Sequence, residues 1–434
     1  MRLENFIYKT VDEINGQIIF AENIHFAKIG EIVKVIDKTK KIEIGAEVLQ
    51  IEKGRVMLQL MSLPMSMRKK NMSVVFTDKI AKVAVSEKMI NRFFSGTMKP
   101  LDGLPMFIKE KDIPTTGYIV NPVARQTPSE MVQTGFSFID GLNTLVRGQK
   151  LPIFSLSGLP STKVVVDIIN NAFSGEKDSL IIFTALGLTY YESEFYMKKI
   201  TNTKNDYICF LNMADDPITE RILAPRYALS TAEYFAYEKN KNVLVIISDI
   251  TNYCEALREI STLREELPGR RGYPGYMYSD LASIYERASR VKNEVGSVTL
   301  LPVLTVPEDD ITHPIADLTG YLTEGQIVFS RELHQSGIYP PVDILKSLSR
   351  LMQKGIKTDF HKKIAKKIFS NYAKGCKLRQ MESIVGKDSM SKEDIGLLDF
   401  AESVEKNFIN QEIKRTLDET LEIGSKILEE AGLI

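Results

Sequence analysis

The sequence contains little of what disulfide or metal stabilisation requires. Its 434 residues include three cysteines and four histidines. Cys209, Cys254 and Cys376 are odd in number and far apart, and no two of them form a CxxC pair. The histidines are scattered as well, without the close spacing of zinc ligands. These absences exclude a disulfide framework and argue against a metal site, and they predict a reducing, cytoplasmic location.

The sequence also lacks an excess of charge of either sign and lacks long apolar runs. Fifty-six basic residues balance 56 acidic ones, so no broad positive surface predicts a nucleic-acid partner. The N-terminal stretch MRLENFIYKTVDEING has no basic leader followed by an apolar run. No segment approaches the ~20 apolar residues that cross a bilayer. We therefore expect this protein to lie at a membrane only through its partners.

Three parts of the chain differ in the period of their apolar residues, and a hydrophobic content of 44% is enough for several cores. In residues 1–75, alternating runs such as EIVKVID and GRVMLQL predict a small N-terminal β-barrel. In residues 76–345, runs such as SLIIFTAL and NVLVIIS alternate with helical stretches, which favours an α/β domain with a mainly parallel sheet. Residues 121–135 are interpreted as the linker entering this domain. Residues 346–434 show helical spacing, which predicts a helical C-terminal domain.

The segment FSLSGLPSTKVVVDII, residues 154–169, has the form of a phosphate-binding loop without its signature. A Walker loop, G-x-x-x-x-G-K-[ST], cradles phosphates with glycine amides and reaches them with a lysine. Placing its last position on Thr162 puts Ser155 and Pro160 at glycine positions and Ser161 at the lysine position. Proline has no amide hydrogen and serine has no positive charge. Nucleotide binding by this degenerate loop is therefore expected to be weak or absent.

Two further residues of the degenerate loop resemble parts of a working one. Gly158 lies inside the turn, and Lys163 directly follows Thr162. A helical residue that comes one position late points about 100° away from the required direction. An ordinary surface lysine is therefore the simpler interpretation of Lys163, and the loop keeps its shape but lacks its chemistry.

Acidic residues supply the second half of a nucleotide site. VLVIISD places Asp249 after an apolar strand, where nucleotide-binding domains carry a carboxylate that helps to hold Mg²⁺. An aspartate in this position is often only a helix cap or turn residue. Hydrolytic domains of this kind also carry a water-orienting glutamate after the strand that follows the loop. Here IIFTALGLTYYESEF offers no carboxylate before Glu192, which belongs with Glu194 to a helix-like segment.

Several long blocks of sequence carry a family resemblance. They are NPVARQTPSEMVQTGFSFIDGLNTLVRGQKLPIFSLSGLP, FLNMADDPITERILAPRYALSTAEYFAYEKNKNVLVIISDITNYCEALREIS, REELPGRRGYPGYMYSDLASIYERASR and GIYPPVDILKSLSRLMQKGI. Together they resemble the non-catalytic B subunit of V-type and A-type rotary ATPases over nearly the whole chain. The resemblance implies a β-barrel, a RecA-like central domain and a helical C-terminal domain. It also implies that the degenerate loop is kept for assembly.

The resemblance further implies partners. The chain would alternate with catalytic A subunits in a hexameric ring, next to a central stalk and a peripheral stalk. A membrane sector that moves H⁺ or Na⁺ would be coupled to ATP hydrolysis or synthesis in this ring. No nucleotide would be bound tightly by this chain alone, and ATP or ADP with Mg²⁺ would be bound only at the subunit interface.

One residue is assigned a role by the same resemblance. Arg350 in SLSRLM matches the family's interfacial arginine, which would reach the phosphates held by the neighbouring catalytic subunit. An ordinary interface ion pair is the alternative interpretation. Lys346 departs from the family, which often has proline shortly before this arginine. The loop PGRRGYPGY, residues 268–276, would face the central stalk, and a plain flexible loop is its alternative.

Two other classes of function stay open at this stage. The chain could be an independent ATPase or the catalytic subunit itself, but Pro160, Ser161 and the missing glutamate argue against both. It could also be a binding module for cytoskeletal or regulatory partners, for which the sequence offers no motif.

Overall fold

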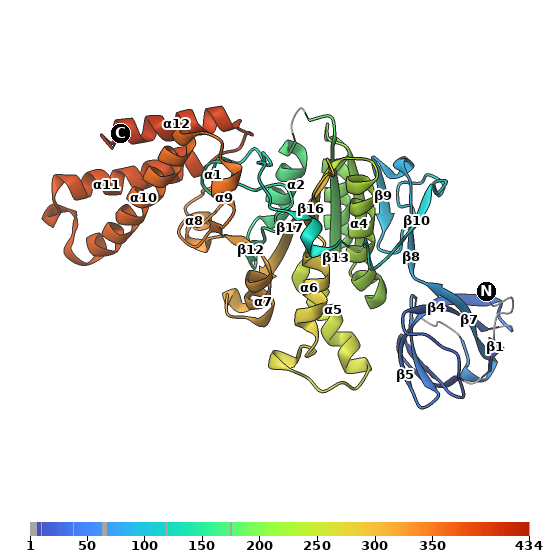
Figure 1. The fold of residues 1–434 in the computed structure, drawn as a ribbon. Helices are drawn as coiled ribbons and strands as arrows, with labels where there is room; N and C mark the ends of the chain where they lie inside the picture. The colour runs from blue at the N-terminus through green and yellow to red at the C-terminus, as the bar shows by residue number, and fades with distance from the viewer. Residues whose placement is uncertain are drawn as a thin grey trace.

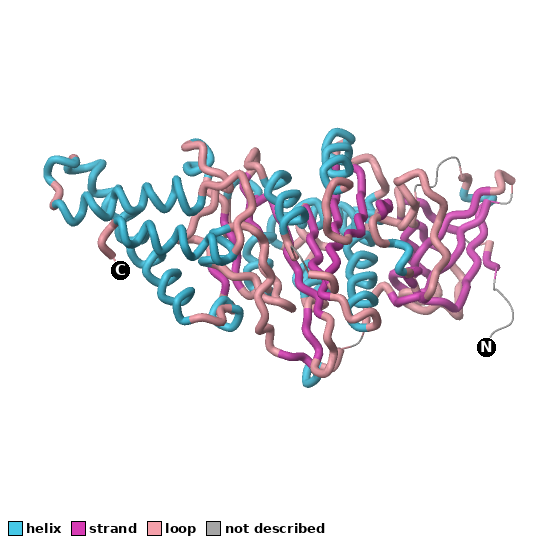
Figure 2. Tube along the Cα trace, turned by 90° about the horizontal axis from the view of Figure 1, so that it is seen from above, coloured by secondary structure: helices cyan, strands magenta, loops and turns pink. Residues whose placement is uncertain are grey.

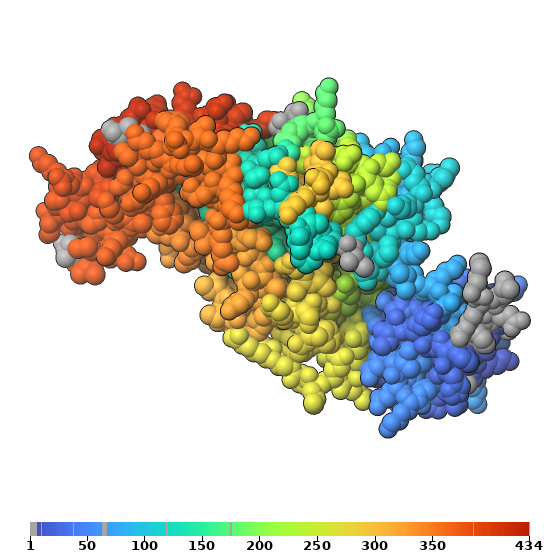
Figure 3. All heavy atoms as spheres, in the orientation of Figure 1, coloured from blue at the N-terminus to red at the C-terminus, as the bar shows by residue number. Residues whose placement is uncertain are grey.

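The computed structural model describes residues 7–9, 11–37, 39–62, 67–118, 120–173 and 176–433. The chain forms an elongated molecule with a β-sheet domain at one end and a bundle of helices at the other (Figures 1 and 2). An α/β domain lies between them, and the space-filling view shows the three parts following one another in chain order (Figure 3).

The N-terminal domain is a seven-stranded antiparallel sheet in the order β1-β7-β4-β5-β6-β3-β2. Its strands are β1 (Ile7–Tyr8), β2 (Val11–Asn15), β3 (Ile18–Ala21), β4 (Glu31–Asp37), β5 (Ile42–Glu52), β6 (Arg55–Leu60) and β7 (Met72–Ile80). Alternate residues of β4 and β6 are buried, because successive side chains of a strand point to opposite faces. The expected barrel is thus present as a half-barrel in the described residues.

The central domain contains a ten-stranded sheet whose main path is β19-β18-β12-β17-β15-β13-β14-β9. Seven of its strands run parallel: β9 (Arg92–Ser95), β12 (Ile153–Leu156), β13 (Ser179–Leu188), β14 (Tyr207–Met213), β15 (Asn242–Ser248), β17 (Ser297–Val306) and β18 (Gly325–Val328). Antiparallel additions are β11 (Arg125–Gln126), β16 (Ser289–Val291) and β19 (Leu348–Ser349). Strands β8 (Lys82–Val85) and β10 (Lys111–Pro114) form a separate pair. The predicted mainly parallel sheet is confirmed.

Helices cover both faces of this sheet, and each face has its own apolar core. The helices of the central domain are α1 (Ser137–Leu142), α2 (Ser161–Asn171), α3 (Tyr190–Ile200), α4 (Ile218–Tyr237), α5 (Ile250–Leu263), α6 (Met277–Tyr285), α7 (Pro314–Leu322) and α8 (Arg331–Gln335). One core joins α4, α5 and α6 to the sheet through residues such as Tyr253 and Leu281. The other joins α2 and α3 through residues such as Ile168 and Tyr196. Burial on both faces explains why the central strands are continuous apolar runs.

The C-terminal domain is helical, as the apolar spacing predicted. It contains α9 (Met352–Gly355), α10 (Asp359–Val385), α11 (Lys392–Ser403), the π-helical turn Val404–Ile409 and α12 (Leu417–Glu430). Ile364, Ile368, Phe408 and Leu428 lie in its core and are almost completely buried. Within the described residues, no helix combines the length and the apolar character needed to span a bilayer.

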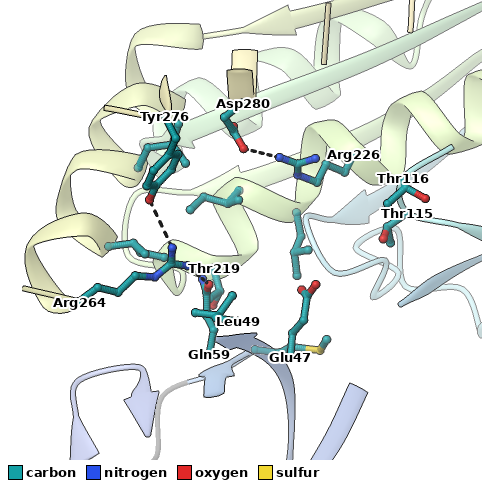
Figure 4. Close-up of a pocket in the computed structure, with 15 residues that line it drawn as sticks. Glu47, Leu49, Gln59, Thr115, Thr116, Thr219, Arg226, Arg264, Tyr276 and Asp280 are labelled. Carbon is teal, nitrogen blue, oxygen red and sulfur yellow. Dashed lines mark hydrogen bonds and ion pairs between the residues drawn. The ribbon is translucent and has the colours of Figure 1, made fainter. Parts of the chain in front are cut away.

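The half-barrel contacts the central domain around a small pocket of about 210 Å³ (Figure 4). Arg264, the residue that follows α5, donates a hydrogen bond to Gln59 of β6 across this boundary, at 2.9 Å. Glu47 points from β5 into the same pocket. Among the described residues, no hydrogen bond or ion pair joins its carboxylate, and burial raises its pKa although Arg226 and Arg264 oppose the shift.

Replacement of Glu47 by glutamine is expected to stabilise the protein at pH 8. The folded-state pKa is raised, so the ionised carboxylate costs free energy above that pKa and costs none once both states are protonated. The gain in melting temperature, a few degrees or less, should therefore shrink as the pH falls towards the glutamate pKa of the unfolded chain. Thermal unfolding at several pH values measures this, with exposed Glu52→Gln at the end of β5 as the control. A lower melting temperature for Glu47→Gln at pH 8 would contradict the expectation.

Candidate functional site

The degenerate loop lies where a phosphate-binding loop should lie, between β12 and α2 at the carboxyl edge of the parallel sheet. Two of its backbone amides have acceptors within the chain. The Leu159 amide donates to the Leu156 carbonyl at 3.1 Å, and the Ser161 amide donates to the Leu159 carbonyl at 2.8 Å. Pro160 between them has no donor and is the N-cap residue of α2. Gly158 has the positive φ of +79° that the turn requires, in open space.

The side chains of the same loop point to protein groups. Lys163 places its ammonium 3.8 Å from the centre of the Tyr339 ring, a cation–π contact. Tyr339 in turn donates its hydroxyl to Asp167 at 2.6 Å. Ser155 is fully buried. Lys163 and two loop amides therefore already have partners within the chain.

Arg331, the first residue of α8, also contacts this loop. Its guanidinium donates to the Ser157 carbonyl at 3.0 Å and forms an ion pair with Asp309 at 2.7 Å. Arg331 thus lies against the degenerate loop, and the carboxylate of Asp309 balances its charge. The sequence contains no motif around Arg331 that could have predicted this contact, because its partners are 22 and 174 residues away.

Asp249 follows β15 and caps α5. Its carboxylate accepts the backbone N–H of Thr251 at 2.8 Å and that of Thr305 at 2.9 Å. Burial is the main cause that raises its pKa, and these hydrogen bonds oppose the shift. Thr305 pairs with Ser155 across β17 and β12, so Asp249 does lie near the degenerate loop. The described residues include no group of three or more His, Cys, Asp or Glu side chains that could hold a metal ion.

Glu192 and Glu194 lie in α3, beyond the end of β13, where hydrolytic domains of this kind carry a water-orienting glutamate. Glu192 forms a capping box with Thr189, whose backbone N–H donates to the Glu192 carboxylate at 2.9 Å. Glu194 is exposed. Glu192 therefore stabilises the start of α3.

Arg350 lies at a different place, just after β19. Its backbone N–H donates to the Glu324 carbonyl at 2.9 Å, and its guanidinium makes a long contact of 3.4 Å with the Thr323 carbonyl. The side chain is exposed, and no carboxylate of the described residues forms an ion pair with it. Lys346, the departure from the family pattern, pairs with Asp343 at 3.2 Å.

Gly325 positions Arg350. β18 pairs with β19 through Gly325 and Ser349, and Gly325 has a φ of +135°. A Cβ atom at Gly325 would lie 2.0 Å from the Leu348 carbonyl oxygen, so only glycine permits this pairing. Arg350 therefore lies at the amino end of β18, whereas Arg331 follows its carboxyl end. The requirement for glycine at 325 was not visible in the sequence.

The loop 264–276 between α5 and α6 projects from the lower side of the central domain (Figures 1 and 3). It includes PGRRGYPGY. Ion pairs tie it to the segment after β17, with Arg271 to Asp310 at 2.8 Å and Arg270 to Asp317 at 3.4 Å.

Two family models match the chain in succession. The nucleotide-binding domain of the ATP synthase alpha/beta family matches residues 135–349. The C-terminal domain of V and A type ATP synthase matches residues 351–433. The boundary between the two matches falls at Arg350.

Individual relatives match over the whole length. A V-type ATP synthase beta chain of Geotalea uraniireducens is 49% identical over 100% of this chain and 99% of its own length. One of Thermus thermophilus is 46% identical over 97% of this chain and 91% of its own. A solved structure, described as a unique ATP synthase subunit NeqB from Nanoarcheaum equitans, is 41% identical with a TM-score of 0.77 and covers 96% of this chain and 100% of its own. The chain therefore belongs to the ATP synthase alpha/beta family, among the beta chains of V-type ATP synthases, the B subunits of V/A-type rotary ATPases.

Proposed function

We propose that this B subunit is itself non-catalytic and completes the catalytic sites of neighbouring A subunits with Arg350. In this proposal it alternates with A subunits in a hexameric ring around a central stalk, with a peripheral stalk outside. The ring lies in the cytoplasm, is attached to the membrane through other subunits, and couples ATP hydrolysis or synthesis to H⁺ or Na⁺ transport. The observation that carries the proposal is the exposed guanidinium of Arg350, which no carboxylate of the described residues neutralises.

The position of Arg350 supports action on a neighbouring subunit. Arg350 and the degenerate loop lie at opposite ends of β18, so the two cannot act on the same phosphate group. A guanidinium is planar and permanently charged, and it binds phosphate oxygens through two parallel hydrogen bonds. An arginine delivered to a catalytic site by a neighbouring protein typically contributes ~10³ to 10⁵ in rate.

The loop argues against the alternative that this chain is an independent or catalytic ATPase. Pro160 and Ser161 remove an amide donor and a cation, and Lys163 lies on the Tyr339 ring. Arg331 and Asp309 supply the charges at the loop from within the chain. We infer that the chain alone holds no nucleotide tightly, and that ATP or ADP with Mg²⁺ is bound at the subunit interface by groups of the A subunit.

Arg350→Ala is expected to leave folding and assembly intact and to lower ATP turnover of the complex by about 10³-fold or more. The reason is that alanine removes the charge next to the phosphates and breaks no ion pair within the described part of the chain. Arg350→Lys should also lower ATP turnover strongly, because lysine keeps the positive charge but cannot form two parallel hydrogen bonds with phosphate. The measurement compares ATP turnover of reconstituted complexes with their assembly on a sizing column.

A matched control is Lys354→Ala, an exposed cation four residues further along the chain. This variant should assemble and turn over ATP at the wild-type rate. If Arg350→Ala and Arg350→Lys do the same, Arg350 has no catalytic role, although the family assignment would stand.

The purified chain alone is expected to show no ATP turnover and to bind Mg-ATP more weakly than about 100 µM, which is less than ~5.5 kcal/mol of binding free energy. The physical reason is that two loop amides already have acceptors, that Pro160 has no amide hydrogen and that the loop lacks the lysine. Titration calorimetry measures the affinity, with Lys163→Ala as a variant that should change nothing. Micromolar affinity that is lost in Lys163→Ala would show that the loop still binds phosphate.

A further inference from the structure

A large cleft separates the segment 345–353 from α10 and includes Arg350 in its lining. Its volume is about 1060 Å³. We call it the basic cleft, because five cations and, among the described residues, no acidic side chain line it. These cations are Lys346, Arg350, Lys362, Lys366 and Lys374.

Most of this charge is not balanced inside the chain. Lys346 pairs with Asp343, and Lys362 has a loose contact of 3.4 Å with exposed Asp359. Within the described residues, Arg350, Lys366 and Lys374 form no ion pair with any carboxylate. Like charges that share a cleft repel one another, so the isolated chain gains nothing from this arrangement.

One face of α10 forms a wall of the cleft. The residues of α10 that line the cleft follow the spacing i, i+3, i+4, i+7, i+8, i+11 and i+12, which is a single stripe along three turns of a helix. They are Lys362, Ala365, Lys366, Phe369, Ser370, Ala373 and Lys374. Phe369 is 44% exposed, and Leu345 and Leu348 on the opposite wall are 40% and 53% exposed. Exposed apolar side chains flanked by cations indicate a surface that another segment covers.

We propose that the basic cleft receives an acidic segment of the neighbouring A subunit, whose apolar side chains pack on Phe369, Leu345 and Leu348 while its carboxylates pair with Lys366 and Lys374. This inference rests on the proposed function and deepens it, because Arg350 lies in the same cleft. Charge complementarity identifies the occupant as acidic. Two copies of this chain that meet cleft to cleft do not fit, since they would bring two sets of unbalanced cations together.

The charge-reversal pair Lys366→Glu and Lys374→Glu tests the proposal in the full-length chain. Both lysines are exposed on α10, where glutamate is an equally good helix former, so the fold should survive. We expect the affinity for the purified A subunit to fall at least ~10-fold at low salt, mainly through slower association. We also expect the salt dependence of binding to weaken or reverse. The neutral pair Lys366→Gln and Lys374→Gln should show a smaller loss in the same direction.

The control pair is Lys363→Glu and Lys392→Glu, two exposed lysines of the same domain outside the cleft. It changes the net charge equally and should alter the affinity less than ~3-fold. Equal effects of the two reversal pairs would overturn the proposal, because the cleft would then have no specific role. A homodimer of the wild-type chain that is lost in the Lys366→Glu and Lys374→Glu variant would overturn the proposal as well.

Failure of this inference and failure of the proposed function give different results. If the cleft variants assemble normally while Arg350→Ala abolishes turnover, the cleft proposal is wrong and Arg350 keeps its role. If Arg350→Ala turns over normally while the cleft variants bind the A subunit weakly, the docking cleft stands and the catalytic role of Arg350 is lost. Phe369→Ser provides a check that does not depend on charge, with an expected loss of affinity that does not vary with salt.

Discussion

The parallel pairing of β12 with β17 and β18 determines where the distinctive groups of this subunit meet. Ser155 pairs with Thr305, and Phe154 pairs with Val328. The carboxyl ends of β12, β17 and β18 lie side by side at the same edge of the sheet, because the three strands are parallel. The segments that follow are therefore adjacent, and the contact of Arg331 with Asp309 and the Ser157 carbonyl is a direct consequence of this register.

Strand β18 separates two arginines that have different environments. Arg331 follows the carboxyl end of β18 and is neutralised by Asp309. Arg350 lies beyond β19 at the amino end of β18, held by backbone contacts alone among the described residues. Because Gly325 admits the Leu348 carbonyl so closely, the β18–β19 pairing fixes this position. Arg331 is thus engaged within the chain at the degenerate loop, whereas the guanidinium of Arg350 has no carboxylate partner among the described residues.

The architecture could largely be predicted from the sequence, and the contacts of the site could not. Long apolar runs such as NVLVIIS identify buried parallel strands because both faces of the sheet are covered. β18 and β19 have only four and two residues, too few for a periodic pattern. The defects at Pro160 and Ser161 are visible in the sequence itself. The contact of Lys163 with Tyr339 joins residues 176 positions apart, and no local pattern encodes such a pair.

An unbalanced guanidinium on a surface has consequences for assembly as well as for catalysis. A salt bridge already made within a chain must be broken before a new partner can use the charge, which offsets most of the gain. Arg350, Lys366 and Lys374 have no such bridge among the described residues, so a phosphate or carboxylate of a neighbouring subunit gains the full interaction. The cost appears in the free chain as mutual repulsion across the cleft. In the proposed ring, the cations of the basic cleft would meet their counter-charges on assembly, and Arg350 would reach the phosphates of the neighbouring subunit in the same step.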